Sequence, residues 1–374
     1  MIRKVIFWAH LVTGVLAGAV ILIMSLTGVL LTYEYQMIES ADMKLMSAQN
    51  TDAPRISMES ALQVAGQYGN ASSVVVRNNI AAPYEVSFGR RGRAFIDAYT
   101  GEYLGEGEPG MRNFMSSLRS WHRWLNVNGD GRDTARAITG ASNAIFLFIL
   151  ISGIYLWLPK VWNRASLSIR LWLKLKPTNS KVRDYNWHHA MGIWTVIPLI
   201  ALVATALVIS YPAVRGVMND LTAESGSESE ESAEPAIQAI VPPQGAELLG
   251  MNQLMDITQQ QLDRWYKITL TPASNGNAPA QAVIAYTNAI QPTQQETWQL
   301  NPYTGEVIGK NGWHDLSRQA QAGQVARRLH TGEFYGVFGQ TIAGIVSLIA
   351  CFMVYTGIAL AWRRLISPLF NKAQ

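Results

Sequence analysis

Four long stretches of the chain are dominated by apolar residues and contain no Asp, Glu, Lys or Arg. They are Leu11 to Tyr33, Ala137 to Leu158, Ala190 to Val214 and Phe334 to Trp362. Each has the roughly 20 residues that an α-helix needs to cross the hydrocarbon core of a bilayer. The pattern predicts four transmembrane helices, and the first stretch is too long for the apolar region of a cleavable signal peptide.

Two segments of more than a hundred residues, 34–136 and 215–333, interrupt this pattern and show the periodicities of soluble domains. Helical apolar spacing is followed by strand-like alternation in both, at Ser57–Tyr68 and Tyr84–Phe88 in the first and at Met251–Leu262 and Tyr266–Leu270 in the second. This order predicts, in each segment, an α-helix packed on a small antiparallel sheet.

The two halves of the chain resemble each other. The sequence IDAYTGEYLG at 96–105 reappears as LNPYTGEVIG at 300–309, and each copy predicts a strand, a Thr-Gly turn and a second strand. Recurring spacings also mark the spans: His-x3-Gly-x12-Thr from His10 and His188, and Gly-x12-Gly-Ile from Gly140 and Gly344. The chain is therefore expected to be a tandem of span, external domain and span.

Basic residues gather between the second and third stretches. The segment 159–184 holds seven Lys and Arg against one acid, and Arg363 and Arg364 follow the last stretch. Because Lys and Arg favour the cytoplasmic side of a membrane, we expect both termini and this loop in the cytoplasm. The two insertions, the second with an acidic Ser/Glu stretch at Glu224 to Glu234, are then external and periplasmic in a Gram-negative cell. The prediction is a multi-pass protein of the bacterial inner membrane.

These expectations divide the chain into seven segments. They are the first span (1–36), a first external domain (37–120), the second span with an external histidine segment (121–160), a cytoplasmic basic loop (161–184), the third span (185–214), a second external domain (215–328) and the fourth span with a cytoplasmic tail (329–374). The predicted fold class is a membrane all-α bundle of four transmembrane helices, a tandem 2+2 repeat, with two external α+β insertions.

Composition narrows the chemistry. Charged residues make up 15% of the chain, and the basic residues behind its net charge of +4 lie beside the spans, which favours lipid over nucleic acid as a partner. The single cysteine, Cys351, excludes an internal disulfide, a CxxC redox pair, covalent c-type haem attachment and a thiolate zinc site. Any haem is therefore expected to be held non-covalently.

Four of the six histidines stand near the starts of the four spans: His10, His122, His188 and His330. The predicted topology puts His10 and His188 at the cytoplasmic face and His122 and His330 at the external face. Two repeats related by a pseudo-two-fold axis would pair them in that way. Two facing imidazoles supply both axial ligands of a b-type haem iron. The alternative for each histidine is an interfacial residue that hydrogen-bonds to lipid headgroups.

Residues beside these histidines suit the same cofactor. Gly14 and Gly192 lie one turn after His10 and His188, where a glycine lets a porphyrin approach the helix closely. Arginines that can hold haem propionates stand near the outer pair: Arg112, Arg119, Arg123, Arg132, Arg327 and Arg328. His189 points about 100° away from His188 and is expected to be structural or supporting. A zinc site is disfavoured, because ligands at opposite membrane faces cannot share one ion.

Short motifs spread over nearly the whole chain are shared with one known family. They include His10-x3-Gly14, Trp121-His122-Arg123, Ser152 to Trp157, Trp187-His188, Leu329 to Gly332 and the turn Asp97 to Glu102. With these motifs the chain resembles the PepSY-associated transmembrane family, whose members include inner-membrane ferric-siderophore reductases such as the ferrioxamine reductase. The resemblance implies PepSY-like external domains, two haem b groups, and electron transfer across the membrane to a ferric chelate.

The leading expectation is therefore a haem-dependent ferric-siderophore reductase that releases Fe(II) during iron uptake. His10, His188, His122 and His330 would be the axial iron ligands, and no other catalytic residue is expected. The electron donor would be a quinol or a cytoplasmic reductant, and lipid the other partner. Two alternatives stay open: a quinol-linked b-type cytochrome with another acceptor, and a non-enzymatic, membrane-anchored PepSY protein that binds or regulates others.

Overall fold

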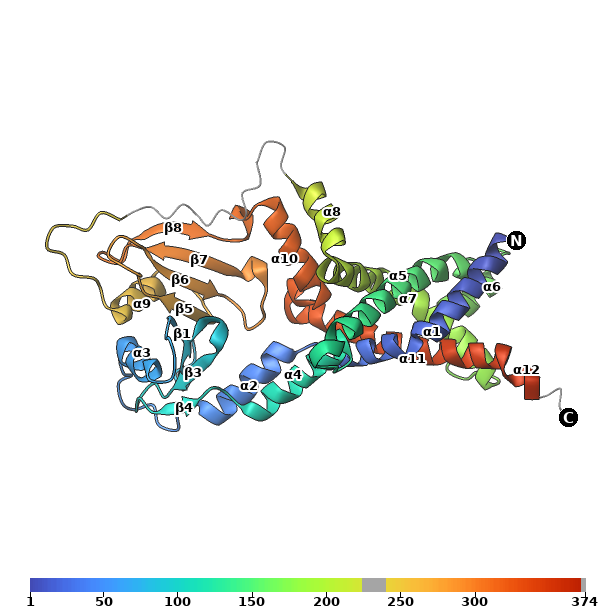
Figure 1. The fold of residues 1–374 in the computed structure, drawn as a ribbon, viewed down its shortest axis with the longest axis horizontal. Helices are drawn as coiled ribbons and strands as arrows, with labels where there is room; N and C mark the ends of the chain where they lie inside the picture. Colours follow the sequence, from blue (N-terminus) through green and yellow to red (C-terminus); the bar gives the residue numbers. More distant parts are fainter. Residues whose placement is uncertain (224–239, 371–374) are drawn as a thin grey trace. The chain divides into compact units, whose positions relative to one another are not determined.

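The computed structural model describes residues 1–223 and 240–370 (Figure 1). The chain forms two compact units, and each is assembled from separate parts of the sequence. One unit comprises Met1–Tyr33, Met115–Leu221 and Val325–Gln374, and the other comprises Glu34–Phe114 and Thr222–Gln324. The acidic Ser/Glu stretch at 224–234 lies outside the described residues.

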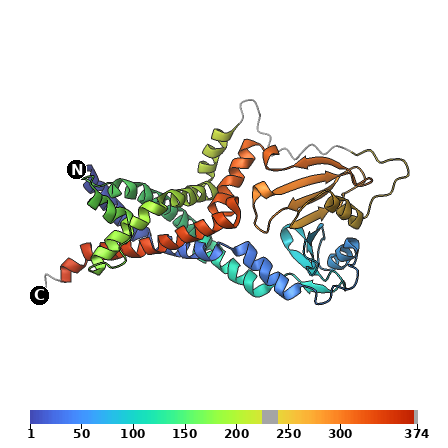
Figure 2. The same cartoon turned by 180° about the vertical axis from the view of Figure 1, so that it is seen from behind.

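Among the described residues, four helices are long and apolar enough to cross a membrane, as the charge-free stretches predict. They are α1 (Ile2–Leu31), α5 (Arg132–Trp157), α7 (Ser180–Ser210) and α11 (Gly336–Leu365). Both α1 and α7 pack against α5 and against α11. The four helices therefore form a ring in which α1 and α7 stand diagonally opposite each other, and Figure 2 shows this bundle from behind.

The helices do not begin and end where the apolar stretches do. The first begins at Ile2 and the third at Ser180, after the Asn179 side chain has capped the backbone N–H of Val182. Consequently His10 and His188 lie within transmembrane helices rather than at their first residues. The prediction that the third helix continues to Val214 is wrong: it ends at Ser210, because Pro212 has no N–H to continue the ladder and instead opens a new helix.

Shorter helices complete the two units. They are α2 (Glu34–Met46), α3 (Met58–Gly66), α4 (Pro109–Trp124), α6 (Arg164–Leu171), α8 (Pro212–Thr222), α9 (Met251–Gln260), α10 (Arg318–His330) and α12 (Ser367–Phe370). Single turns of 3₁₀-helix lie at Gly89–Arg91, Gly129–Gly131, Pro292–Gln294, Trp313–Asp315 and Glu333–Tyr335. Of these helices, α4 and α10 matter most for the site, because each ends on one of the singled-out histidines or close to it.

The second unit contains an antiparallel sheet of eight described strands in the order β4-β3-β2-β1-β5-β6-β7-β8. They are β1 (Ser73–Arg77), β2 (Tyr84–Ser87), β3 (Arg93–Ile96), β4 (Tyr103–Gly105), β5 (Lys267–Thr271), β6 (Ala280–Ala285), β7 (Gln295–Leu300) and β8 (Val307–Asn311). The two insertions do not form two separate sheets, because β1 pairs with β5, with Val75 opposite Thr269. This pairing removes two exposed strand edges.

The two Tyr-Thr-Gly turns of this sheet have the same construction. Asp97 Oδ1 accepts the backbone N–H of Tyr99, and Asn301 Oδ1 accepts that of Tyr303 in the same way. Both turns then need a left-handed glycine, with φ +76° at Gly101 and +73° in the second copy. Asn and Asp are therefore interchangeable here, because the turn uses only one side-chain oxygen.

One face of the sheet is an apolar core and the other carries buried charges. The core includes Val74, Ile268, Ile284 and Trp298, packed with residues of α3 and α9. On the other face Arg77 donates through Nε to Glu39 Oε1 at 2.9 Å and through Nη2 to Glu85 Oε2 at 2.5 Å. Arg93 donates to the other oxygen of Glu85. The charges are thus paired in a network that joins α2 to the strands.

Candidate functional site

The outer histidines face each other at one end of the helical bundle. His122 lies near the end of α4 and His330 is the last residue of α10; their ring centres are 6.2 Å apart and the ring planes are inclined by 51°. His122 Nδ1 lies 3.0 Å from the hydroxyl of Thr27 on α1. His330 Nδ1 donates to the carbonyl of Leu202 on α7, at 2.9 Å. Each ring is thus fixed to one of two diagonally opposite helices.

The inner histidines are anchored in the same manner toward the other end of the bundle. His10 projects from α1, and its Nδ1 lies 2.9 Å from the hydroxyl of Ser152 on α5. His188 projects from α7, and its Nδ1 lies 3.0 Å from the hydroxyl of Thr356 on α11. The two histidines therefore stand on diagonally opposite helices.

The hydroxyl partners determine which ring nitrogen carries the proton. The Thr27 hydroxyl donates to the carbonyl of Ile23, at 2.7 Å, and the Thr356 hydroxyl donates to that of Phe352, at 3.0 Å. Ser152 likewise donates to a carbonyl of its own helix. When the single hydroxyl proton is donated to the helix carbonyl, the hydroxyl oxygen accepts from the histidine Nδ1–H. In that arrangement all four rings are the tautomer whose Nε2 has a free lone pair, the form that binds metals.

A glycine lies beside three of these anchors and makes room for the ring. A Cβ placed on Gly28 would lie 3.5 Å from His122 Cε1, one on Gly153 3.5 Å from His10 Cε1, and one on Gly357 3.4 Å from His188 Cε1. These contacts would accommodate alanine but not a larger side chain. The sequence signal for these glycines is a Ser-Gly or Thr-Gly pair within a span, at Thr27-Gly28, Ser152-Gly153 and Thr356-Gly357. The fourth pair is Thr205-Ala206, and there a backbone carbonyl is the partner of His330.

The outer pair fits an iron between the two rings. Two metal–nitrogen bonds of about 2 Å each, together with the two ring radii, span about 6 Å, which agrees with the observed separation. Burial, followed by the proximity of His330 and Arg123, lowers the pKa of His122 to about 4, and burial lowers the pKa of His330. Both rings are thus neutral, as ligands must be. Among the described residues no group of three or more His, Cys, Asp or Glu is placed to hold a metal ion.

His189 differs from its neighbour in how it is held. Its Nδ1 donates to the carbonyl of Tyr185 one turn earlier, at 2.9 Å, and its ring lies on the Tyr185 ring at 4.1 Å. Its hydrogen-bond partner is therefore in its own helix rather than on a facing one.

The two glycines one turn after His10 and His188 differ in the space beside them. An added Cβ at Gly14 would meet nothing within 4 Å, whereas one at Gly192 would lie 3.1 Å from Met353.

The arginines predicted near the outer pair differ in the elements they lie on and in the partners they bind. Arg112 belongs to the sheet-containing unit and donates to Asp42 there. Arg328 pairs with Glu333 at 2.7 Å. Arg119 and Arg327 each precede an outer histidine by three residues and so share its helical face. The propionate role of these two positions stays a prediction.

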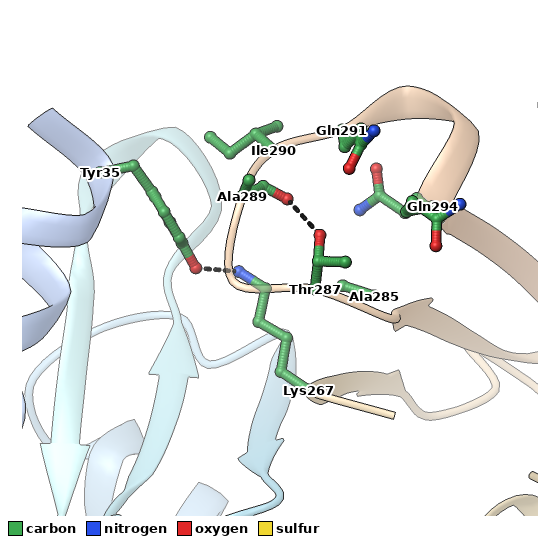
Figure 3. A pocket seen from close by; sticks show the side chains of 9 residues that line it. Tyr35, Lys267, Ala285, Thr287, Ala289, Ile290, Gln291 and Gln294 are labelled. Atoms are coloured by element: carbon green, nitrogen blue, oxygen red, sulfur yellow. Dashed lines mark hydrogen bonds between the residues drawn. The ribbon is translucent and has the colours of Figure 1, made fainter. Parts of the chain in front are cut away.

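A small cavity lies in the sheet-containing unit. It is lined by Tyr35, Lys267 and residues of the segment that links β6 to β7, and Figure 3 shows the Lys267 ammonium donating to the Tyr35 hydroxyl, at 2.7 Å. Its volume of about 30 Å³ has room for about two water molecules. This cavity is too small for an iron chelate.

The sequence of the chain matches one known protein family. The model of the family described as PepSY-associated TM region matches residues 7–364, which confirms the resemblance seen in the sequence. No curated protein matches the chain. The match includes all four anchored histidines and most or all of each of the four long apolar helices. The chain therefore belongs to the PepSY-associated TM region family.

Proposed function

We propose that the protein is a dihaem b-type reductase of the bacterial inner membrane that passes electrons to a ferric siderophore outside the membrane. The observation that carries this proposal is the common anchoring of His10, His188, His122 and His330. In each, Nδ1 is fixed by an acceptor on a neighbouring helix, and Nε2 has no partner among the described residues. Imidazoles held in this way are typical axial haem ligands.

In this proposal the residues position and tune the cofactors. When bound, each haem supplies a one-electron carrier. His10 and His188 hold one group near the basic loop 159–184, which we assign to the cytoplasm with both termini, and His122 and His330 hold the other at the opposite end. The hydroxyls of Thr27, Ser152 and Thr356 fix the ring orientation, as acceptors behind ligating histidines do.

Electron transfer to iron is tested with the anaerobically reduced protein. Mixed with a ferric siderophore and a chromogenic Fe(II) chelator, it should be reoxidised and should release one Fe(II) for each electron lost. The same siderophore loaded with gallium(III), which has the same charge and shape but accepts no electron, is the control and should leave the protein reduced. Haems that stay reduced with the ferric form would favour the quinol-linked cytochrome with another acceptor. A protein without haem would favour the membrane-anchored binding protein.

Replacing Thr27 by valine tests the anchoring of His122. Valine has nearly the shape of threonine but cannot accept the Nδ1–H bond, so we expect haem binding at the outer site to weaken roughly 10- to 100-fold. Haem titration of the apoprotein measures this. Thr13→Val is the matched control, because the Thr13 hydroxyl donates only to backbone carbonyls of its own helix. Equal affinities in the two variants would argue against a supporting role for Thr27.

A further inference from the structure

Three arginines beside His122 have no carboxylate to neutralise them. Arg123, Arg132 and Arg136, called here the arginine cluster, are exposed, and none forms an ion pair within the described part of the chain. Asp130 and Asp133 are close in sequence but do not pair with them. Arg123 and Arg132 lie over the ring of Trp124, at 4.9 and 4.0 Å. The cluster is therefore a concentration of unpaired positive charge.

The charges in this region repel one another. The pKa of Arg123 is lowered first by burial and then by Arg136, Arg132, Arg327 and Arg119, and no acidic group is among the causes. Like charges held together destabilise a fold unless an anion binds between them. The buried indole N–H of Trp124 also has no acceptor among the described residues, so it is a further free donor. These features favour an anionic ligand.

The cluster is not explained by two haem propionates. Arg119 and Arg327 stand at matching positions before the two outer histidines and suit that role. The arginine cluster has no such symmetry: with Gly140 aligned to Gly344, the residues that correspond to Arg132 and Arg136 are Gly336 and Gln340. Basic residues at an external membrane end also run against the usual distribution of charge. A role specific to the first half of the chain is therefore required.

We propose that the arginine cluster docks an anionic, carboxylate-bearing ferric chelate next to the outer haem. This inference rests on the proposed function and names its substrate class. Arg123 directly follows His122 on the same helix and is near enough to influence its charge, so a chelate bound there would lie close to a residue proposed to hold the outer haem. Guanidinium groups bind free carboxylates bidentately. A haem held by His122 and His330 would supply the single electron that reduces the chelated Fe(III) to Fe(II), and would itself be oxidised by one electron, so the exchange balances without a proton.

The kinetic test uses the double variant Arg132→Gln/Arg136→Gln in nanodiscs of neutral phosphatidylcholine. At low ionic strength we expect its rate constant for reoxidation by ferric dicitrate, an anion, to fall roughly tenfold or more, and the difference to disappear at high salt. Reoxidation by the hexaammineruthenium(III) cation should stay the same or become faster. Arg164→Gln/Lys176→Gln, in the basic loop, is the matched control and should change neither rate. Equal losses with both acceptors, no loss with ferric dicitrate, or loss of haem from the variant would each overturn the proposal.

A binding test separates this inference from the proposed function. Gallium(III) dicitrate has the charge of the ferric form and accepts no electron, and calorimetry on the full protein should show at least a tenfold weaker affinity in the double variant. If the protein carries no haem but this difference is found, the docking site stands and the reductase proposal fails. If haem is present and gallium dicitrate does not bind in neutral nanodiscs, or binds both proteins equally, the docking site is wrong. In that case anionic lipid headgroups become the better candidate ligand.

Discussion

Replacing His122 by alanine is expected to remove one of two haems, and replacing His330 to remove the same one. The two rings face each other at 6.2 Å and would share one iron, so loss of either leaves a single axial ligand. Likewise His10→Ala and His188→Ala should both remove the other haem. Haem content per chain and low-temperature visible spectra of the purified variants measure this, with the expected loss being half of the bound haem.

His314 provides the matched control for these variants. It belongs to the sheet-containing unit, whereas the four anchored histidines belong to the helical unit, and His314→Ala should retain both haems. The pairing would be contradicted if His122→Ala and His330→Ala removed spectrally different haems. It would equally be contradicted if one haem disappeared with His122→Ala and His188→Ala, because those two residues are assigned to different groups.

Replacing Glu85 by alanine is expected to destabilise the sheet-containing unit by about 3–5 kcal/mol, because it leaves the buried charge of Arg77 with half of its partners. Thermal unfolding of the full chain measures the effect, followed by circular dichroism and by tryptophan fluorescence, to which the buried Trp298 contributes. Glu102→Ala is the control, since Glu102 is exposed and forms no ion pair among the described residues. Similar unfolding temperatures for the two variants would refute a structural role for the network.

The Glu85 carboxylate also makes the stability of the sheet-containing unit depend on pH. Burial alone would raise the pKa of Glu85, but Arg77 and then Arg93 hold it below its usual range. A carboxyl whose pKa is depressed on folding stabilises the fold above its unfolded pKa, and this stabilisation is lost as pH falls through the folded value. We therefore expect the unit to lose stability below about pH 4, and Glu85→Ala to show a smaller loss over that range. Equal pH profiles would contradict this assignment.

The membrane helices are predictable from sequence because a lack of charge over some twenty residues has one common structural meaning. The ends of these helices are harder to predict from sequence. Arg3 and Lys4 lie in the first turns of α1, because a charged residue does not end a helix at the membrane surface. The join between β1 and β5 was missed for another reason. The two strands are almost 200 residues apart, and the sequence of neither strand shows that they pair.

The candidate site, too, is only partly predictable from the sequence. The four histidines are visible in the sequence as a repeat, but the acceptors that orient them come from other helices. Thr27 and His122 are 95 residues apart, and Thr356 and His188 are 168 apart. The ion pair between Arg112 and Asp42 is likewise formed only by the fold, because the two residues are 70 apart in the chain. Spacing along the chain thus identified candidate ligands, and the packing of helices showed how they are held.

The most direct test of the dihaem proposal is the visible spectrum of the detergent-purified protein, oxidised and reduced, combined with a pyridine haemochrome assay. The account predicts two non-covalent b-type haems per chain, a Soret band, and sharp α and β bands on reduction, as expected for iron with two histidine ligands. A protein purified from haem-replete cells, correctly folded by circular dichroism but lacking a Soret band, would contradict it.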